Sequence, residues 1–123
     1  MQDFSVFSLG QVLLVSIEED ISDTTVNTLK ETVGALVGRE EVYGVIVDLH
    51  HLEVMDSYLA EQLQDLAGML KLLQAEVVIA GLSVPVVMTL LDFGITLPDM
   101  EFALDVEQAL IRLQEGQLRQ LSS

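Results

Sequence analysis

One small hydroxyl and two carboxylates gather at a single predicted strand-to-helix junction. The apolar run 45–47 leads into Asp48, and after a short loop Asp56 and Ser57 stand where a helix is predicted to begin. In α/β domains, ligands and partners usually bind at such junctions, beside the carboxyl ends of the strands. These three side chains are therefore the first candidates for a functional site.

Ser57 allows two interpretations. Serine is among the preferred N-cap residues, and capping alone explains its position. Asp56 caps equally well, however, and would leave Ser57 at the first helical position with a free hydroxyl that a kinase can phosphorylate. A phosphate would add about −1.5 to −2 charges, which a helix N-terminus tolerates but a docked partner would resist. From the residues alone, capping is the simpler interpretation.

Catalytic interpretations fail on the residues available. The eight glycines form neither a G-x-G-x-x-G pattern nor a P-loop, and no serine lies in a G-x-S-x-G elbow. His50 and His51 are the only histidines. Neighbouring side chains of an extended segment point in opposite directions, so we expect the two to share neither a catalytic nor a metal site. We predict a protein that is not an enzyme and holds no metal or cofactor.

A receiver-like phosphoacceptor role for Asp48 is also disfavoured. Receivers need a lysine after a late strand, and the last lysine, Lys71, lies in a predicted helix ahead of those strands. Asp48 therefore remains a signature residue of the junction without a predicted chemical step.

Charge and composition limit the possible partners. Five Lys and Arg against twenty Asp and Glu give a net charge of −15, and the scattered cations argue against nucleic acid and anionic membranes. No apolar run approaches 18 residues, the N-terminus lacks the cationic start of a secretory signal, and there are no cysteines. We expect a cytoplasmic protein. With half the residues apolar and a mean hydropathy of +0.48, we also expect apolar surface for protein–protein contact.

The elements that must position these residues follow the order ββαβαβαβα, which predicts an α/β fold with a mixed, mostly parallel five-stranded sheet and about four helices. Strands are predicted at 4–7, 11–17, 42–48, 77–80 and 102–104. Helices are predicted from Ser22-Asp23 to Gly38, over 57–73, from Ser83 to Gly94 and from Asp105 to Gly116. The short third helix is expected to be filled by Val87, Leu90, Leu91 and Phe93. One domain is expected over 1–123, with a loop at 95–101 and a frayed tail at 117–123.

The predicted helix over 57–73 is strongly amphipathic. A buried stripe is expected at Leu59, Leu63, Leu66, Leu70 and Leu73. Helical projection turns the opposite face outward, with Gly68 in the middle of it. A glycine there costs helix stability, and close approach by another chain is one reason to keep it. The residues predicted to bind a partner are Asp56, Tyr58, Glu61, Asp65, Gly68 and Leu72.

The stretch from Asp48 to Ser57 resembles the STAS-domain signature of anti-sigma-factor antagonists: Asp, an apolar residue, a spacer, then Asp-Ser at a helix start. The resemblance in element order extends over nearly the whole chain. Segments 13–17, 55–57, 81–82 and 93–95 are more closely similar to the single-domain, RsbS-type branch found in stressosomes. Tyr58 fits that branch, where many antagonists have a second Ser or Thr. His50 stands where many relatives have Ser or Thr, which argues against a second phosphoacceptor.

The resemblance implies a non-catalytic signalling scaffold. Subunits of this type assemble with larger paralogues that carry a sensory N-terminal domain, and the assembly sequesters an RsbT-type switch serine kinase. The kinase phosphorylates a serine that corresponds to Ser57 and is released, and a phosphatase resets the state. Two alternatives remain open. One is an antagonist that binds an anti-sigma kinase one to one; the other is a small-ligand or nucleotide-binding module that uses Asp48, His50 and Asp56.

Overall fold

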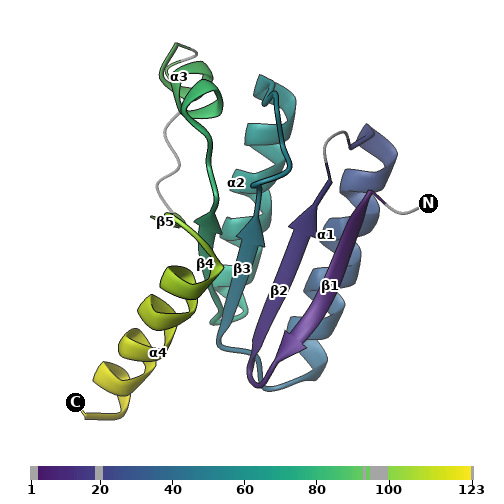
Figure 1. The fold of residues 1–123 in the computed structure, drawn as a ribbon. Coiled ribbons are helices and arrows are strands. Elements are labelled where there is room, and N and C mark those ends of the chain that lie inside the picture. Colours follow the sequence, from purple (N-terminus) through teal and green to yellow (C-terminus); the bar gives the residue numbers. More distant parts are fainter. Residues whose placement is uncertain (1–2, 19–20, 93, 95–99, 123) are drawn as a thin grey trace.

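The computed structural model describes residues 3–18, 21–92, 94 and 100–122 (Figure 1). The predicted α/β class and the order ββαβαβαβα are confirmed. The elements are β1 (Phe4–Leu9), β2 (Val12–Ile17), α1 (Asp23–Arg39), β3 (Gly44–Asp48), α2 (Ser57–Leu72), β4 (Glu76–Ala80), α3 (Val84–Asp92), β5 (Met100–Ala103) and α4 (Val106–Ser122).

The five strands lie in the sheet in the same order as in the sequence, β1-β2-β3-β4-β5. β1 is antiparallel to β2, and the remaining neighbours are parallel. A two-residue turn joins β1 to β2, where Gly10 has φ +65 and the pair Leu9↔Val12 closes the hairpin. Because β3 and β4 are parallel, the segments that follow them, which lead into α2 and α3, lie at the same edge of the sheet.

Helices cover both faces of the sheet (Figure 1). Val45 and Val47 of β3 pack into the larger core with α1 and α2, whereas Ile46 packs into a second core with α4. This explains why β3 is a continuous apolar run, since a strand buried on both faces has no polar side. On its own face, α4 lies across β3, β4 and β5.

Two predicted helix ends were wrong. α1 continues through Gly38 to Arg39, and α4 continues through Gly116 to Ser122, so the predicted frayed tail is helical through Ser122. A glycine ends a helix when it adopts the left-handed conformation. Neither of these glycines has a positive φ, and the helical hydrogen bonds therefore continue past them.

Two further expectations were wrong in part. Of the apolar residues expected to fill α3, Leu90 is buried, whereas Val87 and Leu91 are exposed and Val86, which was not named, is buried. Leu73 is also exposed, because α2 ends at Leu72 and Leu73 is its C-cap. Phe93 and positions 95–99 of the predicted loop lie outside the described residues. In the part of the chain that is described, no helix is both long and apolar enough to cross a membrane.

Candidate functional site

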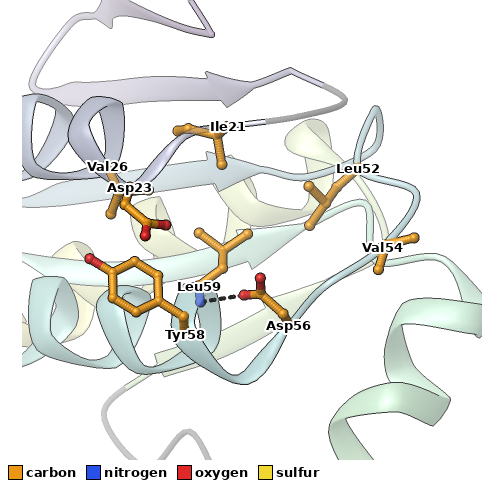
Figure 2. A pocket seen from close by; sticks show the side chains of 8 residues that line it. All are labelled: Ile21, Asp23, Val26, Leu52, Val54, Asp56, Tyr58 and Leu59. Carbon is orange, nitrogen blue, oxygen red and sulfur yellow. Dashed lines mark hydrogen bonds between the residues drawn. The ribbon is translucent and has the colours of Figure 1, made fainter.

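The start of α2 gives Asp56 and Ser57 different roles. Asp56 has an extended backbone, and its carboxylate accepts a hydrogen bond from the Leu59 N–H at 2.8 Å (Figure 2). Its carbonyl accepts from the Ala60 N–H at 3.2 Å. Asp56 is therefore the N-cap. Ser57 becomes the first helical residue and is exposed.

Two other serines at helix starts make a useful comparison. The Ser22 hydroxyl accepts from the Thr25 N–H at 3.2 Å, and the Ser83 hydroxyl accepts from the Val86 N–H at 3.4 Å. Both are therefore engaged in capping. Within the described ranges no hydrogen bond of the Ser57 hydroxyl is found. Ser57 is thus the helix-start serine whose hydroxyl is left available for chemistry.

A small cavity of about 60 Å³ lies between the N-terminal ends of α1 and α2. Figure 2 shows the carboxylates of Asp23 and Asp56 and the ring of Tyr58 around it. Pockets for drug-sized ligands enclose roughly 300–1,000 Å³, so this cavity is too small for a nucleotide. Tyr58, one of the residues predicted to bind a partner, is half-buried and borders the cavity.

Asp48 organises the loop that leads to α2. Its carboxyl group accepts from the His50 N–H at 3.1 Å and lies 2.7 Å from the His50 Nδ1, and the residue is only 8% exposed. Gly81, with φ +78, follows β4 and packs directly against Asp48 and His50. Asp48 therefore acts here as a buried acceptor that fixes the loop.

The prediction that His50 and His51 point in opposite directions was wrong. Their ring centroids lie 3.7 Å apart. The segment is a turn, in which the Leu52 N–H donates to the Leu49 carbonyl at 2.9 Å, and not the extended segment that the prediction assumed. Even so, the described residues contain no group of three or more histidines and carboxylates arranged for a metal ion.

Among the pockets formed by the described residues, none is lined by all three residues of the small-ligand alternative. Asp48 bonds to His50, while Asp56 lines the cavity between α1 and α2, and neither Asp48 nor His50 lines that cavity. The geometry of these three residues gives the alternative no support.

The outward face of α2 is partly bordered by α1. Asp65 lies 3.9 Å from the Lys30 ammonium, which also donates to the Gln62 side chain at 2.7 Å. Glu61 is exposed, and Leu72 is 86% exposed. A Cβ added at Gly68 would meet no atom within 4 Å. Of the predicted partner-binding residues on this face, Glu61, Asp65 and Leu72 are exposed, and Gly68 is half-buried with open space beside it.

Sequence reasoning missed two exposed apolar residues at the same edge of the sheet. Val54, in the loop after β3, and Val84, at the start of α3, are each 75% exposed. Leu52 and Met55, which flank Val54 in the sequence, are buried. The position of Val54 between these two apolar residues was the sequence feature that could have indicated its exposure. Solvent-exposed apolar side chains, such as Val54 beside the cavity that Asp56 lines, are features expected of a protein-binding surface.

Comparisons with known proteins agree on the fold. A family model described as the STAS domain matches residues 5–109. RsbS from Moorella thermoacetica, in a variant that replaces a serine by glutamate, is 25% identical with a TM-score of 0.80; the match covers 91% of this chain and 95% of that one. A chain from a structure of the stressosome, which is described as a signal integration and transduction hub, is 27% identical with a TM-score of 0.78. The match covers 90% of this chain and 96% of that one.

More distant structures share the fold alone. The anti-sigma factor antagonist SpoIIAA in its unphosphorylated form is 16% identical with a TM-score of 0.74, and the match covers 91% of this chain and 96% of that one. No curated protein matches the chain.

Proposed function

The chain belongs to the STAS-domain family, and on that premise we propose that it is a non-catalytic signalling scaffold of a stressosome-type assembly. It assembles with larger STAS-domain paralogues and sequesters an RsbT-type switch serine kinase. The kinase phosphorylates Ser57 and is thereby released, and a phosphatase restores the unmodified state. The similarity to RsbS and to a stressosome chain supports this assignment.

The observation that carries the proposal is that Asp56, and not Ser57, caps the start of α2. Asp56 satisfies the helix end, so Ser57 can be modified without removing the cap. The first N–H groups of a helix lack intrahelical partners and favour a negative charge. The fold therefore tolerates a phosphate at this position.

The charges around Ser57 indicate that phosphorylation should weaken kinase binding. Asp23 and Asp56 line the same small cavity, and Glu53 and Glu61 are exposed nearby in sequence. The chain has no Lys or Arg between Arg39 and Lys71. A phosphate therefore adds about −1.5 to −2 charges to a surface that is already acidic, and a kinase docked there loses affinity through repulsion and desolvation.

Ser57→Asp tests this switch. We expect kinase affinity to fall at least tenfold at low ionic strength and to recover partly in 0.5 M salt, where exposed charges are screened. The free energy of unfolding should change by no more than about 0.3–1 kcal/mol, because a carboxylate suits a helix N-terminus. The measurements are kinase titrations at two salt concentrations and a thermal melt.

Ser57→Asn is the matched control for Ser57→Asp, because its side chain has the same shape and no charge. It should retain the kinase. Equal loss of binding in both variants would assign the effect to side-chain size, and undiminished binding by Ser57→Asp would remove charge as the switch.

Gly68→Arg tests whether the outward face of α2 contacts a partner. The space around Gly68 is open, and arginine is a better helix former than glycine by roughly 0.5–1 kcal/mol, so the thermal transition should not fall. We expect kinase binding or assembly with the larger paralogue to weaken at least tenfold, while Gly68→Ala retains both. Normal binding by both variants would exclude this part of the helix from the interface.

A further inference from the structure

β1 is an edge strand without the usual protection. Within the described residues it pairs with β2 alone. Edge strands are normally guarded by charges, prolines or short length, because their unpaired backbone groups can recruit another strand. β1 has six residues, and the chain carries no charged residue or proline from position 4 to 17. By contrast, the opposite edge strand, β5, is shorter and contains the exposed Glu101.

The backbone groups that β1 turns outward can be identified from its register. In an antiparallel pair, alternate residues exchange hydrogen bonds with the partner strand. The Glu18 N–H donates to the Asp3 carbonyl at 2.8 Å, which places Asp3 among the residues bonded across the hairpin. By alternation, the backbone groups of Ser5, Phe7 and Leu9 face β2. Those that face away from the sheet belong to Phe4, Val6 and Ser8.

Mostly uncharged side chains flank this edge on both sides of the sheet. Beside α1 lies a groove of about 520 Å³, lined by three threonines and three apolar residues, with Asp3 as its one charged residue: Asp3, Phe4, Val6, Thr25, Thr28, Thr32 and Leu36. On the other side Phe7 is 56% exposed and Leu9 is 38% exposed. A strand added here would cover apolar side chains as well as gain backbone hydrogen bonds.

We propose that β1 pairs antiparallel with β1 of a second copy of this chain, with a two-fold axis beside Val6. This register joins Val6 to its own copy and Phe4 to Ser8 of the other, and it merges two five-stranded sheets into one. A second copy fits because the pattern is self-complementary, as a two-fold interface requires. Two chains of charge −15 repel, and they approach at low electrostatic cost along this surface, where Asp3 is the one charged residue of the groove and β1 itself carries none. The proposal does not depend on the phosphorylation of Ser57.

Residue-resolved amide hydrogen exchange on the unmodified protein tests the pairing. As protein concentration rises through the association range, the amides of Phe4, Val6 and Ser8 should become protected. The amides of Ser5, Phe7 and Leu9 should be protected at every concentration, because they bond to β2. Sedimentation equilibrium should show dimers, and association should strengthen with salt as the net charge is screened.

Ser8→Pro removes one outward N–H without removing a bond to β2, and edge strands tolerate proline. We expect its dimer dissociation constant to rise at least tenfold, whereas Ser8→Ala, which keeps the N–H, should dimerise normally. If Ser8→Pro fails to fold, the exchange pattern of the unmodified chain decides. A monomer at all concentrations would overturn the proposal. So would a dimer without protection at Val6 and Ser8, which would point to another surface such as the apolar groove between α3 and β5.

Discussion

Ser57→Ala is expected to abolish phosphate incorporation when the protein is incubated with its switch kinase and ATP. The Ser57 hydroxyl is exposed at the first helical position and is not consumed by capping. Because Asp56 keeps its hydrogen bond to the Leu59 N–H, the variant should melt as the parent does, within about 0.5 kcal/mol. Mass-spectrometric mapping of the labelled site, beside a thermal melt, is the measurement.

Ser22→Ala is the control for this result. Ser22 also stands at a helix start, but its hydroxyl accepts the Thr25 N–H, so its loss should cost roughly 1 kcal/mol of stability and leave labelling intact. Ser57→Ala should thus lose labelling but keep its stability, and Ser22→Ala should lose stability but keep its labelling. Full labelling of Ser57→Ala would reject Ser57 as the acceptor and require a different hydroxyl.

Gly81→Ala is expected to destabilise the fold strongly. At φ +78 an alanine is strained by roughly 1–3 kcal/mol. Its Cβ would also lie 2.8 Å from the His50 Cβ, 2.9 Å from an oxygen of Asp48 and 3.0 Å from the His50 nitrogen. Two of these atoms are held by the Asp48–His50 hydrogen bonds and cannot move away cheaply. We expect a total loss of about 2–5 kcal/mol in urea denaturation.

Gly10→Ala separates the two causes of that loss. Gly10 has a similar φ of +65, but a Cβ there would meet no atom within 4 Å. It should therefore show the conformational cost without the steric one. Equal losses in the two variants would mean that the loop after β3 relaxes freely around an added methyl group, which would contradict tight packing of Gly81 against Asp48 and His50.

The parts of the site that could be predicted from sequence depend on local chemistry. In the structure Asp56 is the cap of α2, although capping by Ser57 was the simpler interpretation of the residues. Candidate caps can nevertheless be recognised from sequence, because capping depends on groups within four positions along the chain. The same holds for Ser22 and Asp105, whose side chains accept from N–H groups three residues ahead. The remaining roles assigned to Ser57 stay predictions until the kinase is tested.

The parts that could not be predicted depend on distant residues. His50 and His51 turn together because the buried Asp48 carboxyl and Gly81, which follows β4, shape their loop. Glycine was a poor guide to helix ends, since Gly38 and Gly116 remain helical while Gly94, after α3, has a positive φ. α3 is apolar on several sides, so its sequence indicated Leu90 but did not reveal that Val86, and not Val87 or Leu91, is buried beside it.

The sequential order of the sheet has a consequence for synthesis on the ribosome. Each strand from β2 to β5 pairs with the strand made just before it, so a growing chain can extend the sheet without waiting for distant segments. The exception is the second face. Ile46 and Val78 pack in the core that α4 covers, and α4 emerges after all five strands. We expect the nascent chain to carry an uncovered apolar face until α4 has emerged, and to depend on chaperones most in that interval.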